Sequence, residues 1–178
     1  MYFQRIINDF LIYHALISPQ VEIRPIMNTD NQSVAKIIRQ VLEDLNVPKV
    51  GTAYADKSLD AMFESFQNEG AQYFVVSKNN RLLGGAGIAP LNGADNDICE
   101  LQKMYFLKEA RGHGYGELMM QRCLDFAKAQ GYTKCYIETM PYMAAAQKLY
   151  IRSGFQKIDQ PLGDTGHYSC TVWFLKTL

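Results

Sequence analysis

An arginine and three glycines lie close together in residues 110–123, whose sequence is ARGHGYGELMMQRC. Gly112, Gly114 and Gly116 leave the backbone bare, and a helix-like pattern follows them directly. Backbone amides at a helix N-terminus have no partners inside the helix and carry partial positive charge, so they attract anions. Each exposed contact of this kind contributes only about 0.3 to 1 kcal/mol, so several amides and the charge of Arg111 must act together. The pattern predicts a site that binds phosphate groups.

Two familiar phosphate-binding motifs rely on the same physics, and neither fits this loop. The loop lacks the Gly-Lys-Ser/Thr of a P-loop. A Rossmann fold also requires an acidic residue for ribose recognition at the end of a following parallel strand about twenty positions further on, and no acidic residue fits that place cleanly. A glycine loop that only made a tight strand-to-helix turn would not need all three glycines. We therefore interpret the loop as the site of another phosphorylated ligand.

The segments around the loop indicate the elements that must position it. Alternating and β-branched patterns predict strands at residues 21–26, 72–78, 82–91, 98–106 and 134–139, and two more that start at Phe155 and at His167. Apolar residues three and four positions apart predict helices at about residues 31–45, 59–66, 115–130 and 143–153. Asn28, Thr29 and Asp30 offer N-cap side chains for the first of these helices.

The order of these elements determines the expected fold class. It runs strand, two helices, three antiparallel strands, helix, strand, helix, two strands. This predicts an α/β fold with a mixed, mostly antiparallel central sheet of about seven strands flanked by about four helices. The hairpin expected at residues 72–91 contradicts a repeated βαβ fold, and with it a nucleotide-dependent oxidoreductase. Gly84, Gly85 and Gly87 in that hairpin indicate a bulge or a close backbone approach.

Length and charge narrow the class of protein further. The chain has 178 residues, the size of one domain. We expect that domain to comprise residues 21–178, after an N-terminal extension of unknown role at residues 1–20. The 18 basic residues balance the 18 acidic ones, so no overall field recruits nucleic acid or an anionic membrane. A charged ligand must therefore be held by a local site.

The four cysteines and the first twenty residues indicate the cellular compartment in which the protein is expected. The four cysteines show neither CxxC spacing nor a paired histidine cluster, so the sequence signals no metal site and no redox motif. Reduced core thiols in a cytoplasmic protein are the better interpretation. The first twenty residues hold only an eight-residue apolar stretch, interrupted by His14, so we expect neither a signal peptide nor a membrane span there. A short amphipathic helix could run through Ile6, Ile7, Phe10 and Leu11.

Arg111, Gly114 and Gly116 resemble the glycine loop of the GCN5-related N-acetyltransferase (GNAT) family, which binds acetyl coenzyme A (acetyl-CoA). The family's motif is Arg or Gln, two residues, Gly, one residue, then Gly or Ala, and these three residues fill it. The resemblance implies that the loop holds the pyrophosphate of coenzyme A through residues Arg111, Gly112, His113, Gly114, Tyr115 and Gly116. The side chain of His113 is expected to point to solvent beside the phosphates.

A second stretch, AAAQKLYIRSGF at residues 144–155, resembles the family's later motif. That motif has an alanine, then Leu-Tyr and, after three residues, Gly-Phe, which here are Ala146, Leu149, Tyr150, Gly154 and Phe155. The resemblance covers most of the chain after about Val21, because the family shares the order of elements. Many members carry an asparagine three residues before the alanine that contacts the cofactor. This chain has Met143 there, so no polar pantetheine contact is implied at that position.

Acyl transfer from a thioester to an amine requires a neutral nucleophile, and hence a base. A lysine-like amine with a pKa of about 10.4 lies about 3.4 units from neutral at pH 7, which costs about 4.6 kcal/mol, whereas an α-amino group costs about 1 kcal/mol. We predict that Glu100 is the general base, because it lies on the strand leading to the loop, eleven residues before Arg111. The spacing resembles the histone-modifying branch of the family, in which a glutamate at this place acts as general base. Glu138 is the alternative base, and Glu100 could instead pair with a lysine or only orient the substrate.

Tyr150 is the predicted general acid, as its match to the family's Leu-Tyr implies. The coenzyme A thiol has a pKa near that of cysteine, about 8.5, so a phenol near 10 can protonate the departing sulfur without being ionised at rest. The alternative is a tyrosine that only packs. Main-chain amides around Met104 and Tyr105 are expected to polarise the carbonyl, where a break between neighbouring strands would admit the thioester like an added strand.

Four further residues are predicted to contact the acceptor, namely Glu138, Tyr142, His167 and Tyr168. The leading hypothesis is an acetyl-CoA-dependent N-acetyltransferase that acts on a primary amine of a small molecule or a protein. The alternative is a non-catalytic domain that binds acyl-CoA as a sensor or regulator. Having both Glu100 and Tyr150 favours the enzyme, whereas Met143 favours the sensor. A homodimer is frequent in families that resemble this one.

Overall fold

A computed structural model describes residues 21–178, so the short helix expected through Ile6 to Leu11 lies outside the described residues. One sheet forms the centre of the fold, with strands in the order β1-β2-β3-β4-β5-β7-β6. Its strands are β1 (Val21–Pro25), β2 (Gln72–Lys78), β3 (Arg81–Pro90), β4 (Ile98–Phe106), β5 (Lys134–Thr139), β6 (Gln156–Ile158) and β7 (Val172–Thr177). The β4–β5 pair is parallel and the other pairs are antiparallel. The predicted mixed, mostly antiparallel sheet of seven strands is confirmed.

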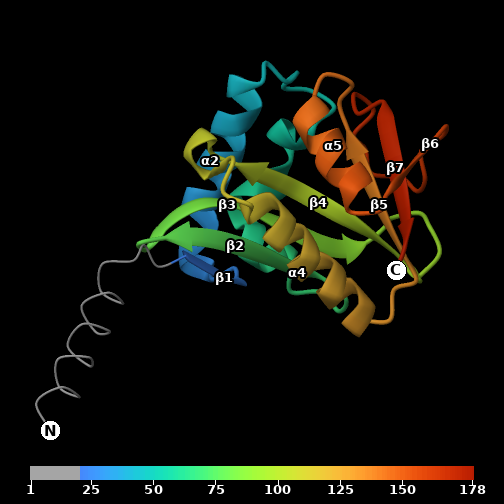
Figure 1. Ribbon diagram of the computed structural model, residues 1–178, viewed down its shortest axis with the longest axis horizontal. Coiled ribbons are helices and arrows are strands. Elements are labelled where there is room, and N and C mark those ends of the chain that lie inside the picture. Colours follow the sequence, from blue (N-terminus) through green and yellow to red (C-terminus); the bar gives the residue numbers. More distant parts are fainter. Residues whose placement is uncertain (1–20) are drawn as a thin grey trace, which may run out of the picture.

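Four α-helices cover the two faces of this sheet: α2 (Asn31–Asp44), α3 (Met62–Ser65), α4 (Tyr115–Ala129) and α5 (Ala144–Arg152). Alternation along β2 separates the faces, because Phe74 and Val76 pack with α4 while Tyr73 and Val75 pack with α2. Figure 1 shows α4 crossing in front of the strands. Among the described helices, none combines the length and apolar character that a membrane span needs.

Three local predictions differ from the structure. The second helix was expected over residues 59–66, but residues Lys57–Ala61 form a 3-10 turn and only α3 is α-helical. Asp30 precedes α2 as expected of a cap, yet its carboxylate pairs with Arg24 at 2.7 Å instead of capping the helix. The last strand begins at Val172 and not at His167, because a turn closed by the bond from the Cys170 amide to the His167 carbonyl (2.8 Å) comes first.

The expected irregularity in the hairpin is present, and it involves both β3 and β4. A Cβ atom on Gly85 would lie 2.5 Å from the Phe74 carbonyl oxygen, so only glycine allows this approach. Gly85 pairs with Tyr105 and Gly87 with Gln102, so β4 contains one more residue than β3 between these pairs. The extra residue forms a bulge at Lys103, whose φ is +51°.

β4 and β5 separate partway along their length. They pair only from Ile98 to Glu100 on β4 and from Lys134 to Tyr136 on β5. Beyond Glu100, β4 continues to Phe106 without β5 as a neighbour. The predicted break between neighbouring strands is therefore present, and Glu100 is the last paired residue before it.

Candidate active site

A cavity of about 600 Å³ opens where β4 and β5 separate. Most of the residues predicted for the site line it: Glu100, Met104, Tyr105, Arg111, Gly112, Gly114, Tyr115, Gly116, Glu138, Tyr142, Ala146, Tyr150 and His167. His113 and Tyr168 are exposed and are not among the described residues that line the cavity. The ring of His113 stacks on Tyr115 with centroids 5.5 Å apart. The role of His113 toward the cofactor and that of Tyr168 toward the acceptor stay predictions.

The glycine loop forms one end of the cavity, and its backbone depends on glycine. Gly112 and Gly114 have φ values of +76° and +77°, which side chains disfavour. A Cβ atom at either position would meet no atom within 4 Å, so the space beside the loop is open. The first amides of α4 to bond back are those of Glu117 and Leu118, both to the Gly114 carbonyl at 3.1 Å. Within residues 21–178, no hydrogen-bond partner takes up the amides of residues 112–116, so the loop fits a pyrophosphate group.

Helix α5 forms the opposite wall of this end of the cavity. Tyr150 is buried there, with its ring centroid 5.7 Å from that of Phe174 in an edge contact. Burial raises the pKa of the Tyr150 phenol well above its usual value, so it stays protonated. Met143 and Ala146 also line this wall and present no charged group.

Glu100 is the buried carboxyl group of the site, with only 5% of its surface exposed. Burial raises the pKa of Glu100 to about 7, and the negative charge of Glu138 adds to the shift. A hydrogen bond from Gln102 Nε2 to Glu100 Oε2 (2.6 Å), together with the nearby positive groups His167 and Lys103, opposes it. A carboxyl group with a pKa near 7 is poised to take and release protons at neutral pH.

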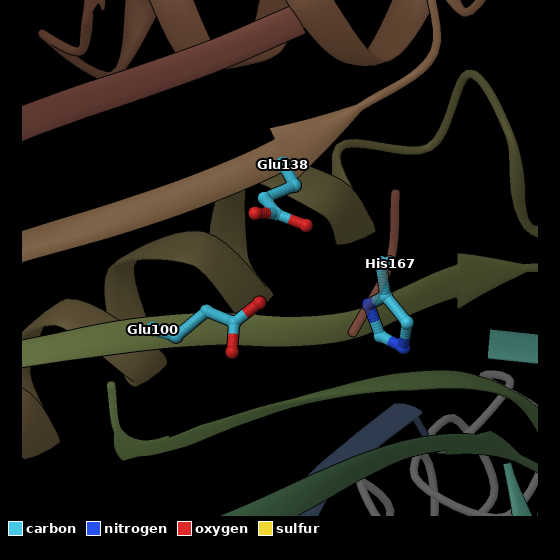
Figure 2. Close-up of side chains that lie close together, drawn as sticks. All are labelled: Glu100, Glu138 and His167. Carbon is cyan, nitrogen blue, oxygen red and sulfur yellow. The ribbon is translucent and has the colours of Figure 1, made fainter. Parts of the chain in front are cut away.

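Glu100, Glu138 and His167 converge beyond the break in the sheet, as Figure 2 shows. One polar atom of each lies within 4.8 Å of the others. Glu138 also accepts hydrogen bonds from the Tyr136 hydroxyl (2.8 Å) and the Thr165 hydroxyl (2.9 Å). Such a donor set would suit a divalent cation, but Glu138 is already engaged in this way and His167 by Asp56.

Sequence reasoning missed two charged residues of the site. Asp56 lies 3.3 Å from His167 Nε2 through each carboxylate oxygen and 2.7 Å from Lys103 Nζ. Burial opposes the charge of Asp56, but the bond from His167 and the charge of Lys103 lower its pKa to about 2. Asp56 is 111 residues from His167 in the chain. No local pattern in the sequence could have connected them.

Comparisons with known proteins agree with this architecture. The model of the acetyltransferase (GNAT) family matches residues 38–155. The uncharacterized N-acetyltransferase YjgM of Escherichia coli (strain K12) is 39% identical over 164 residues, which are 91% of this chain and 98% of that protein.

Solved structures are similar in fold. The crystal structure of an acetyltransferase of the GNAT family from Staphylococcus aureus Mu50 matches with a TM-score of 0.77 and 19% identity, over 89% of this chain and 99% of that one. The PaiA N-acetyltransferase from Thermoplasma acidophilum, in complex with coenzyme A, matches with a TM-score of 0.67 and 14% identity, over 89% and 99%. At these identities the likeness concerns the fold. Given the family match and the relative with 39% identity, this chain belongs to the GNAT family and is an N-acetyltransferase.

Proposed function

We propose that this enzyme transfers the acetyl group of acetyl-CoA to a primary amine of a small molecule or a protein, with Glu100 as general base and Tyr150 as general acid. One observation carries the proposal. Glu100, with its pKa near 7, lies in the same cavity as the glycine loop and Tyr150, at the point where β4 and β5 separate.

The glycine loop is proposed to hold the pyrophosphate of the cofactor. Open space beside Gly112 and Gly114, unpaired amides at the start of α4 and the charge of Arg111 support this role. When bound, acetyl-CoA supplies the reactive thioester. The edge of β4 near Met104 and Tyr105 is proposed to orient that group, because the pairing of β4 with β5 ends at Glu100.

The proposed base must deprotonate an ammonium group. For a lysine-like amine this costs about 4.6 kcal/mol at pH 7, so a base of matched pKa is worth most for such an acceptor. Glu100 meets that need, since about half of it is ionised at pH 7 when its pKa is about 7. Glu138 is the less suitable base, because Tyr136 and Thr165 already donate to its oxygens.

Tyr150 is proposed to donate a hydrogen bond to the departing thiolate. Its raised pKa means that the phenol remains a donor at every pH used for assays. Full transfer of its proton to a thiolate with a pKa of about 8.5 is uphill, so the hydrogen bond itself carries most of the effect.

The acceptor is proposed to enter from the side where Glu138, Tyr142 and His167 line the cavity. Tyr168, which is 75% exposed, would contact only an acceptor that extends beyond the cavity. We place the enzyme in the cytoplasm because its four cysteines are free thiols, which persist in a reducing compartment. A homodimer stays a prediction, which analytical ultracentrifugation tests.

A thiol-release assay tests the proposal. Purified protein is mixed with acetyl-CoA and a panel of amines that includes L-lysine, spermidine, tyramine and peptides with a free N-terminus. Release of free thiol that depends on the amine is expected, with kcat/KM rising about tenfold per pH unit below pH 7 and levelling off above it. The Glu100→Gln variant should lose most of the rate, and its kcat/KM should no longer rise with pH below pH 7. A thermal shift with acetyl-CoA but no thiol release from any amine would instead support the sensor.

A further inference from the structure

His167 lies near the buried Glu100 and is more exposed to solvent. Glu100 has 5% of its surface exposed, whereas the side chain of His167 is 20% exposed. Their nearest polar atoms are at most 4.8 Å apart, which one water molecule can bridge. A proton taken up by Glu100 must leave before the next turnover, and His167 lies on the way out.

The two ring nitrogens of His167 have different surroundings. Nε2 lies 3.3 Å from both oxygens of Asp56. In Figure 2 one ring nitrogen faces Glu100 and Glu138 while the other points away from them. Because Nε2 belongs to the Asp56 contact, the nitrogen that faces the glutamates is Nδ1. An ionised Asp56 accepts a hydrogen bond from the protonated Nε2, which leaves Nδ1 of the neutral ring free to accept a proton.

We propose that His167 carries the proton that Glu100 removes from the acceptor amine out to solvent, and that Asp56 holds the ring for this task. This inference rests on the proposed function. The acceptor ammonium gives a proton to the Glu100 carboxylate, the Glu100 carboxyl gives it to His167 Nδ1, and the imidazolium gives it to water. Nε2 keeps its own proton throughout, so Asp56 is a positioning residue.

The charges around the ring suit a carrier. The hydrogen bond to Asp56 raises the pKa of His167 against the effect of burial, and Glu100 adds to the rise while Lys103 lowers it. Glu138 is the remaining acidic group of the cluster. Asp56 favours the protonated form of His167, and Lys103, whose ammonium lies 2.7 Å from the same carboxylate, disfavours it. Lys103 stays there because it forms the β4 bulge, where the Tyr73 hydroxyl donates to its carbonyl at 3.0 Å.

The loop that carries His167 is tied to the site on its other side. The Thr165 hydroxyl donates to Glu138 and accepts from the His167 backbone amide at 3.2 Å. Asp56, on the segment before α3, therefore holds the ring, while Glu138 on β5 holds the backbone of the His167 loop through Thr165. Such anchoring is what a relay between fixed groups needs.

Two measurements test the inference, and the first needs no acceptor. Proton–nitrogen correlation spectra of the wild-type imidazoles, with the His167 signal assigned by its loss in His167→Gln, report the tautomer. The Nε2-protonated form is expected above the His167 pKa, and Asp56→Asn should lower that pKa. A neutral ring protonated on Nδ1 would overturn the inference. Asp60→Asn, a nearby aspartate paired with Arg39 at the surface, is the matched control and should leave the His167 titration unchanged.

The second measurement uses turnover of acetyl-CoA with the fastest amine of the panel. His167→Gln should lower kcat at least tenfold with coenzyme A affinity unchanged, and added imidazole should restore part of the rate. A merely structural role would give no such rescue. If Glu100→Gln loses activity while His167→Gln keeps it, the role of His167 as proton carrier is refuted, and the role of Glu100 as general base is not. If Glu100→Gln keeps full activity, the proposed function itself fails.

Discussion

Glu100→Gln should make the folded protein more stable at alkaline pH while removing its activity. The pKa of Glu100 is about 7 in the fold against an ordinary value of 4.5. Between these values the folded protein binds more protons at this position than the unfolded chain, so the free energy of unfolding falls as pH rises from about 4.5 to 7. The difference of about 2.5 pKa units corresponds to about 3 kcal/mol. The glutamine amide cannot ionise, yet its oxygen still accepts the hydrogen bond from Gln102.

The assay is the melting temperature, Tm, of both proteins between pH 4.5 and pH 8.5. For a chain of this size, about 3 kcal/mol corresponds to about 6 to 12 °C, so the variant should melt higher by that amount at pH 8. Near pH 4.5 the two should melt within about 2 °C of each other, because Glu100 is then protonated. Glu109→Gln, which removes a surface ion pair with Arg81, is the control and should show no such dependence. A Tm difference that is the same at pH 5 and pH 8 would refute the buried, ionising carboxyl group.

Four further variants test the roles of Tyr150, the glycine loop and the packing at Gly87. Tyr150→Phe should lower kcat by about a hundredfold in the thiol-release assay, while calorimetry should find the affinity for coenzyme A unchanged. An unaltered kcat would show that Tyr150 only packs in the core. Gly114→Ala and Gly131→Ala place a side chain at φ values of +77° and +87° with open space around it, so each should lose about 1 to 2 kcal/mol of stability in urea unfolding. Only Gly114→Ala should also weaken coenzyme A binding, and equal binding by both would contradict the role of the loop. Gly87→Ala would place a Cβ atom 2.5 Å from the Phe66 ring, so a loss of about 1 to 3 kcal/mol is expected, and a Tm equal to that of the wild type would contradict this packing.

The elements around the glycine loop could be predicted from the sequence because each has a strong local pattern. Helix α4 runs from Tyr115 to Ala129, next to glycines at its start and Gly131 after its end. β2 and β4 match their expected bounds, because β2 is a run of aromatic and β-branched residues and clear turns flank both strands. Local patterns therefore sufficed for the fold class and for the glycine loop that lines one end of the cavity.

Contacts between distant segments could not be predicted in this way. The Asp56–His167–Lys103 cluster depends on a loop before α3, a bulge in β4 and a loop before β7 meeting in space. The start of β7 was wrong because polar and aromatic residues at 167–170 resemble a strand locally, while a turn uses their hydrogen bonds. The raised pKa of Glu100 likewise arises from burial, which spacing along the chain does not reveal.

The backbone of residues 111–116 is the part of the molecule on which the proposed function depends most, because it is proposed to hold the pyrophosphate of the cofactor. Calorimetric titration of the wild-type protein with coenzyme A and with pantetheine, which lacks every phosphate, tests it directly. We expect coenzyme A to bind at least tenfold more tightly than pantetheine, and Gly114→Ala to remove most of this difference. Equal affinity for the two ligands in the wild-type protein would contradict the claim.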